Sequence, residues 1–314
     1  MLGPSVKEQS LHNNRRCPYH FQDSMRLYTF PIFLAFVLLS PFANAQIQMR
    51  GLEVGPWLGA AFYLGDLNTE FRFNRPKPAG GFAARYNFNH RLAARASLNY
   101  GRITAYDSDS RNDFEQRRNL NFVSDVLDLT AQFEFNFLPY YHGSAEYPFT
   151  PYAFAGGSLF AFDPQGITPD GQTVKLQRLG TEGQRIGDEY HRLSYALAYG
   201  VGIRWDLSYE LSMDASLSLR NTGTDYLDDV STVYPNNQEL RDYRIDLAGR
   251  MSDPGLPGPD GELIDRTGTQ RGDDTNNDHY FFLGIGINYY FGDVLCPKVF
   301  KGRKVRTGKK KERN

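Results

Sequence analysis

The chain has 314 residues, a formal net charge of −1 and a mean hydropathy of −0.52. No apolar run reaches the roughly 20 residues that a membrane-spanning helix needs, so a helical membrane protein is excluded. Glycine (30 residues), tyrosine (20) and phenylalanine (23) are abundant, and this composition is typical of β-barrels. The composition therefore favours a β-rich fold.

Residues 25–45 have the pattern of a secretory signal peptide. A basic residue precedes the apolar run 31–39, and the segment closes on small residues two positions apart, which suit a signal peptidase. The run is too short to span a bilayer. We therefore expect Sec-dependent export and removal of residues 1–45, with translation starting at Met25 because residues 1–24 are hydrophilic.

Eight segments between residues 46 and 292 show the period-2 alternation of β-strands. In the segment 126–137, apolar side chains from Leu127 to Phe137 occupy one face and polar side chains from Asp128 to Asn136 the other. Most segments have roughly the 9 to 11 residues that a tilted strand needs to cross a bilayer. The eight segments are 52–64, 81–88, 91–100, 126–137, 151–162, 193–206, 211–220 and 280–291.

The connections between these segments alternate strictly between long and short. The short ones are 89–90, 139–148 and 207–210, and the long ones are 65–78, 104–124, 163–190 and 221–279. Outer-membrane barrels have long extracellular loops, short periplasmic turns and an even number of antiparallel strands. The sequence therefore predicts an all-β fold, an eight-stranded antiparallel transmembrane β-barrel in the outer membrane, with both chain ends in the periplasm.

The alternation by itself also fits a soluble lipocalin-like barrel or a β-sandwich. Aromatic residues near the short turns favour the membrane barrel, because such girdles mark the membrane interfaces. These residues are Tyr86, Phe88, Phe137, Tyr140, Tyr141, Trp205, Tyr209, Tyr289, Tyr290 and Phe291.

The polar faces of the strands carry charges of both signs. An eight-stranded barrel is just wide enough for side chains to fill it, so we expect these charges to pair and close the lumen. A pathway for ions or substrates is the alternative, and it requires a wider lumen. The expected interior network is Glu53, Arg85, Arg95, Asp128, Glu134, Arg204, Asp214 and Arg220.

No catalytic motif is present. The histidines after the signal peptide (His90, His142, His191 and His279) are isolated at turns or strand ends, and we expect them at the surface or rim. Nucleophile elbows, phosphate loops and paired cysteines are missing from the sequence. We therefore expect a protein that is not an enzyme and uses no cofactor, metal or small-molecule substrate, with a lipid-modifying barrel enzyme as a further alternative.

Two acidic stretches lie in the longest loop. The stretch 272–278 is rich in oxygen ligands of the kind that Ca²⁺ prefers, but a solvated turn is the preferred interpretation. In the run 224–231, the candidate residues for contact with a partner are Asp225, Tyr226, Asp228 and Asp229. The other interpretation of this run is that it shapes the loop.

Residues 293–314 form a basic tail that we expect in the periplasm. Cys296 is the one cysteine left after removal of the signal, so it is either a free thiol or part of an intermolecular bridge. We expect the tail to bind an acidic partner or an anionic membrane surface, with a tail without any partner as the alternative. Nucleic acid is not expected as a partner of an exported chain. The candidate residues are Cys296, Lys298, Lys301, Arg303 and Lys304.

Several sequence runs resemble the PorG family of Bacteroidetes outer-membrane barrels. They include Tyr63-Leu64-Gly65-Asp66-Leu67-Asn68, Phe149-Thr150-Pro151-Tyr152, Leu179-Gly180-Thr181-Glu182-Gly183-Gln184, the specific run 224–231, and Tyr289-Tyr290-Phe291-Gly292 before Cys296-Pro297. The resemblance covers most of residues 52–297, whereas the long basic ending is less similar.

This resemblance implies a role in the type IX secretion system, which exports proteins and drives gliding motility. Barrels of this family anchor a periplasmic ring, formed by a lipoprotein and its partner, to the outer membrane and are not the translocation pore. The expected partners are therefore this ring and the outer-membrane lipids. The alternative is a small surface-exposed barrel, adhesin-like or porin-like, that is unrelated to secretion.

Overall fold

The computed structural model describes residues 50–258, 260–262 and 264–292. The expected signal peptide and the basic tail, with Cys296, Lys298, Lys301, Arg303 and Lys304, lie outside the described residues. The expectations for these two segments remain predictions.

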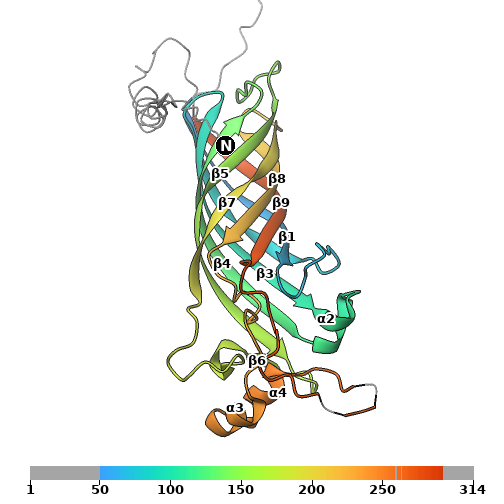
Figure 1. Cartoon of the computed structure of the whole chain (residues 1–314). Helices are drawn as coiled ribbons and strands as arrows, with labels where there is room; N and C mark the ends of the chain where they lie inside the picture. The colour runs from blue at the N-terminus through green and yellow to red at the C-terminus, as the bar shows by residue number, and fades with distance from the viewer. Residues whose placement is uncertain (1–49, 259, 263, 293–314) are drawn as a thin grey trace, which may run out of the picture. The chain divides into compact units, whose positions relative to one another are not determined.

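Eight long strands form a closed antiparallel barrel (Figure 1). Each strand pairs with its neighbours in the order β4-β3-β2-β1-β9-β8-β7-β5, and pairing between β4 and β5 closes the ring. The fold class predicted from the sequence is thereby confirmed. The strands are β1 (Gly51–Leu64), β2 (Lys77–Asn87), β3 (Leu92–Tyr106), β4 (Asn121–Asn136), β5 (Phe149–Ile167), β7 (Leu193–Asp206), β8 (Leu211–Thr222) and β9 (His279–Gly292).

The outer wall of the barrel is apolar. On β4, Leu127 and Phe133 face outward with 51% and 71% of their surface exposed, whereas the inward neighbours Asp128 and Glu134 are buried. Polar side chains inside and apolar side chains outside are the reverse of a water-soluble barrel and the pattern of a barrel surrounded by hydrocarbon. Exposed apolar residues of the wall include Leu52, Leu58, Phe82, Leu98, Leu129, Leu159, Leu197, Val201, Ile203, Leu217, Leu283, Ile285 and Ile287.

The barrel has two different ends. Gly51 pairs with Gly292, so the described chain enters and leaves at the same end, which also carries the short turns. The long connections gather at the opposite end (Figure 1). They contain the short strand β6 (Thr173–Lys175) and the helices η1 (Asp107–Asp109), α2 (Asp113–Arg118), η2 (Gln177–Leu179), α3 (Asn237–Tyr243) and α4 (Asp246–Ser252).

Three strands extend further into the long-loop end than the alternation predicted. β3 continues to Tyr106, β4 begins at Asn121 and β5 continues to Ile167. The alternation fades there because the loops cover the outer face as well; Ile103, Thr104 and Ala105 are consecutive and all buried. Where both faces of a strand are buried, periodicity no longer marks it.

The long loops fold together into a cap whose apolar core is continuous with apolar side chains of the strands. Buried side chains from separate loops pack in one cluster, to which Leu67, Leu120, Leu227, Val230, Leu240, Ala248 and Met251 belong. The helices within the described residues are all short, and none has the length and apolar character that crossing a membrane requires. The cap is therefore a small folded unit on the barrel's strand ends.

Candidate functional site

Ion pairs cross the lumen in its half nearer the short turns. Arg85 lies at the centre, with its Nε 2.7 Å from Oε2 of Glu134 and its Nη1 3.0 Å from Oε2 of Glu53. Arg204 reaches the same Glu134 oxygen at 2.7 Å. Arg95 completes this layer, with its Nη1 3.5 Å from Oδ2 of Asp214. All of these side chains are buried, so each ion depends on its partner for the solvation that water would give.

A second layer surrounds Asp128, nearer the long-loop end. Oδ2 of Asp128 lies 2.9 Å from Nε of Arg220 and accepts a 2.7 Å hydrogen bond from the hydroxyl of Tyr280. Asn99 donates to Oδ1 at 2.7 Å. The structure thus places the eight candidate lumen residues in two layers, with four arginines and four carboxylates.

Little free space remains between these layers. A void lined by Trp57, Arg95 and Phe282, among other residues, has a volume of about 20 Å³. That is room for about one water molecule. Side chains therefore fill the lumen at this level.

The connection 137–148 closes the lumen at the short-turn end. His142 points into the barrel, where its Nε2 lies 3.4 Å from Oε1 of Glu53 and its Nδ1 3.1 Å from Oδ1 of Asp206. Its ring stacks on Tyr290 with 4.1 Å between ring centroids, and the hydroxyl of Tyr140 donates to Asp206. The sequence analysis placed His142, Tyr140 and Tyr290 at the rim, and this was wrong: all three are buried. Alternation ends with the strand and does not reveal that this connection folds inward.

The run 224–231 lies at the base of the cap. Asp229, with a positive φ of 70°, accepts hydrogen bonds from the hydroxyls of Thr181 and Tyr190. Its backbone carbonyl accepts a 2.6 Å hydrogen bond from Arg271, which also lies 2.9 Å from Glu182. Burial raises the pKa of Asp229 to about 6 in spite of the nearby arginine. These contacts tie four separate parts of the loops together.

Asp228 joins the run to two strand ends through one hydroxyl. Tyr63 Oη lies 2.6 Å from Oδ2 of Asp228 and 2.6 Å from Oδ1 of Asp278. The other oxygen of each carboxyl accepts a backbone N–H, from Val230 and Leu227 respectively, at 2.9 Å. Burial, together with repulsion from nearby acids such as Asp66, holds the pKa of both carboxyls well above the usual range.

Asp225 and Tyr226 also face into the cap. Asp225 is buried, with 8% of its surface exposed. Burial, together with nearby acids such as Asp66, raises its pKa to about 8. Tyr226 stacks on Tyr190 with 4.5 Å between ring centroids. Three of the four candidate residues of this run, Tyr226, Asp228 and Asp229, therefore connect separate parts of the chain in this structure.

Arg118 is a central residue of the cap that the sequence analysis did not identify. Its guanidinium lies 2.7 Å from Oδ1 of Asp107 and donates to the backbone carbonyls of Arg271 (2.6 Å) and Asp66 (2.7 Å). It joins three connections, but it lies in a polar stretch whose sequence has no periodic pattern. No sequence signal distinguishes it from the exposed arginines nearby.

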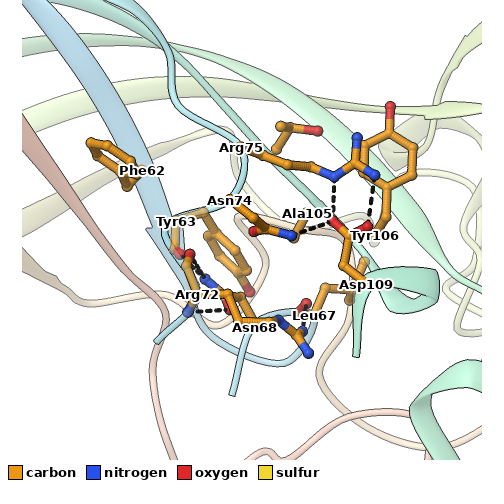
Figure 2. Close-up of a pocket in the computed structure, with 11 residues that line it drawn as sticks. Phe62, Tyr63, Leu67, Asn68, Arg72, Asn74, Arg75, Ala105, Tyr106 and Asp109 are labelled. Carbon is orange, nitrogen blue, oxygen red and sulfur yellow. Dashed lines mark hydrogen bonds and ion pairs between the residues drawn. The ribbon is translucent and has the colours of Figure 1, made fainter. Parts of the chain in front are cut away.

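The connection between β1 and β2 contacts the end of β3 and the residues that follow it, as Figure 2 shows. Arg75 and Asp109 point toward each other and form two hydrogen bonds, and the guanidinium of Arg75 lies 3.9 Å from the ring centroid of Tyr106. The hydrogen bonds from Arg75 lower the pKa of Asp109. The pocket that these residues line has a volume of only about 10 Å³. It is too small for a substrate.

The acidic stretch 272–278 forms a turn. The carboxylate of Asp273 accepts hydrogen bonds from Thr275 and Asn276, and its backbone N–H donates to Asp66. In the part of the chain that the structure describes, no three His, Cys, Asp or Glu side chains converge in a way that holds a metal ion.

A closed ring of eight strands, an apolar outer wall and a lumen filled with paired charges define a small membrane-spanning β-barrel. The chain belongs to the family described as "Domain of unknown function (DUF6089)", whose model matches residues 28–249. No protein with a curated description matches it.

Solved outer-membrane barrels show a distant likeness. OprG from Pseudomonas aeruginosa is 9% identical with a TM-score of 0.39, over 78% of this chain and 98% of that one. Neisserial surface protein A is 12% identical with a TM-score of 0.37 (76% and 97%). Ail of Yersinia pestis is 13% identical with a TM-score of 0.35 (78% and 100%). Scores this low carry no argument about function, and the strand pairing alone defines the fold.

Proposed function

We propose that this chain is a non-enzymatic barrel of the outer membrane that anchors a periplasmic assembly of the type IX secretion system. The observation that carries the proposal is the filled lumen, where Arg85 on β2 and Arg204 on β7, from opposite sides of the ring, both bind Glu134. A barrel closed in this way supports a structural role and not transport through its centre. In this proposal Sec-dependent export delivers the barrel to the outer membrane, with the cap outside the cell.

The short-turn end faces the periplasm in this orientation. β9 ends there at Gly292, so the basic tail 293–314 with Cys296 begins on the periplasmic side. The resemblance to PorG-like barrels implies the partner, which is a ring made of a lipoprotein and its associated protein. The family match covers residues 28–249, which include every barrel strand except β9, and its description names no partner, so the secretion role rests on the resemblance and on this arrangement of the chain ends.

Purification from native membranes tests the proposal. A tag inserted in the exposed loop around Gly261 leaves both chain ends free, and mild detergent keeps membrane complexes together. We expect the ring lipoprotein to copurify with the full chain and to be lost when residues 293–314 are removed. If no periplasmic lipoprotein copurifies, the anchoring role is wrong, and the surface barrel unrelated to secretion takes its place.

A further inference from the structure

A groove of about 730 Å³ lies on the outer wall where the strands meet the cap. Its floor is a row of outward side chains on four neighbouring strands, paired as Tyr100 with Leu127, Leu127 with Ala161, and Ala161 with Leu193. Tyr100, Leu127 and Leu193 are exposed and belong to the apolar wall. The loop 187–192 covers the groove from the cap side. The groove therefore lies at the upper edge of the surface that contacts hydrocarbon.

Charged side chains begin immediately above this row. Arg102 and Asp125 pair across β3 and β4 with a 2.7 Å contact from Nε to Oδ1, and Asp163 is the cross-strand partner of Asp125 on β5. Asp163 is approached by two cations: its Oδ2 lies 2.6 Å from Nζ of Lys175, and its Oδ1 2.7 Å from Nη1 of Arg192.

One carboxylate neutralises only one of these two cations. The remaining acid of the groove, Glu189, is already engaged by Arg244 at 2.8 Å. His191 lines the same side and adds no negative charge. The corner formed by Lys175 and Arg192 therefore has an excess positive charge, and the two side chains are 45% and 42% exposed. Arg192 lines the groove itself, and Lys175 adjoins the groove through Asp163.

Below the groove, the outward face of β5 carries small residues. Ala155 is flanked by Phe133 on β4 and Tyr199 on β7, and Gly157 lies one step nearer the groove. A β-carbon added at Gly157 would meet no atom within 4 Å, so the wall is open at that point. Leu159, which is 59% exposed, lies on the same face between Gly157 and Ala161, so this opening is separate from the groove, and apolar side chains of the wall lie directly below the groove.

We propose that this groove binds a phosphate-bearing lipid of the outer leaflet, with the phosphate against Lys175 and Arg192 and an acyl chain along the apolar wall below Leu127 and Leu193. Lysine and arginine are the usual phosphate ligands of proteins, and basic residues at the hydrocarbon edge attract anionic headgroups. The inference rests on the membrane orientation proposed above but not on the anchoring role.

Binding of a lipid A-type phosphorylated glycolipid in detergent micelles tests the site, with the delipidated full chain as receptor. We expect Lys175→Ala/Arg192→Ala to weaken binding by roughly tenfold or more, because each basic residue near a membrane surface contributes a several-fold effect. The dephosphorylated glycolipid should bind the wild type as weakly as the phosphorylated one binds this variant. The matched control is Arg241→Ala/Arg250→Ala, which removes two similarly exposed arginines from α3 and α4 and should change nothing.

Heat-modifiable migration on gels checks that both variants fold. The proposal is overturned if the lysine–arginine variant binds like the wild type, if the arginine control loses as much affinity, or if millimolar inorganic phosphate alone displaces the lipid. Copurification of the periplasmic lipoprotein is measured in parallel. Unchanged copurification beside lost lipid binding assigns the effect to this groove, whereas absent copurification with intact lipid binding contradicts only the anchoring role.

Discussion

Buried ionisable side chains have different partners in the lumen and at the base of the cap. In the lumen, four arginines lie against four carboxylates from facing strands. At the base of the cap, Asp66, Asp225, Asp228 and Asp278 are buried or half-buried, and none of them has an ion-pair partner among the described residues. A buried acid without a cation is stable mainly in its neutral form.

The geometry around Tyr63 leads to the same conclusion without any reference to pKa values. Its hydroxyl has a single hydrogen but lies 2.6 Å from both Asp228 and Asp278. It donates to one carboxylate, so the other acid must carry a proton and donate to the phenol oxygen. The lumen is thus held by ion pairs, whereas the base of the cap, besides the ion pairs of Arg118 and Arg271, also depends on protons that exchange with the surrounding medium.

Breaking a lumen pair should have the largest effect. Arg85→Met removes one of the two arginines that lie against both Glu53 and Glu134, and loss of a buried ion-pair partner costs about 3 to 5 kcal/mol of unfolding free energy. Urea unfolding in lipid vesicles measures the loss. Arg102→Met removes the exposed pair with Asp125 and should cost at most about 1 kcal/mol. Equal losses in the two variants would show that the lumen charges are not the main support of the barrel.

A methyl group at position 65 should disrupt the base of the cap alone. The β-carbon of Gly65→Ala would lie 1.9 Å from Oδ1 of Asp278 and 2.2 Å from the Tyr63 hydroxyl. Overpacking of this kind costs about 1 to 3 kcal/mol. We expect faster hydrogen exchange in the run 224–231 and unchanged exchange in β4. Gly157→Ala, with open space around its β-carbon, is the control, and equal exchange in both variants contradicts the expectation.

The cap should loosen as the pH rises. An acid with a folded-state pKa above its unfolded value binds more protons when folded, so its stabilising contribution is complete below the unfolded pKa and is lost as the pH rises through the folded one. With Asp66 and Asp229 at about 6 and Asp225 at about 8, the loss runs from about pH 4 to about pH 8. We expect protection of the Leu227 and Val230 amides to fall on the order of tenfold over this range, after correction for intrinsic exchange.

Asp228→Asn tests the proton that Asp228 and Asp278 share around the Tyr63 hydroxyl, because the side-chain amide of asparagine supplies a hydrogen that does not titrate. Its amide protection should depend less on pH than that of the wild type. The matched control is Asp273→Asn, which replaces an acid that lies in the same loop but whose pKa is lowered by hydrogen bonds from Thr275 and Asn276. Identical pH profiles for wild type and Asp228→Asn would refute the shared proton.

The smallest effect is expected for the contact between Arg75 and Asp109 that Figure 2 shows. Arg75→Ala removes the paired hydrogen bonds to Asp109, but Arg75 is 37% exposed, so the loss is about 0.5 to 1 kcal/mol and shrinks at high salt. Thermal unfolding at two salt concentrations measures it. A loss of unfolding free energy as large as that of Arg85→Met would mean that the contact between Arg75 and Asp109, and not the lumen, limits stability.

Sequence alone predicted the strands well because one chemical contrast, hydrocarbon outside and polar groups inside, repeats every second residue. The sequence did not predict which charged residues would form ion pairs, because pairs such as Arg85 and Glu134 depend on the strand register around the ring. The cap was harder still: Tyr63 and Asp278 are 215 positions apart, and no period links them. The inward fold of His142 depends on the packing of an irregular connection, which alternation does not describe.

Ion conductance across a planar bilayer is the most direct measurement of the central point, the filled lumen. With the purified full chain inserted, we predict no current steps above background for the wild type at neutral pH. Stable single-channel currents, altered in size by Arg85→Met or by replacement of Arg220, would show that water and ions pass between the two layers of charge, and the structural role proposed here would then be contradicted.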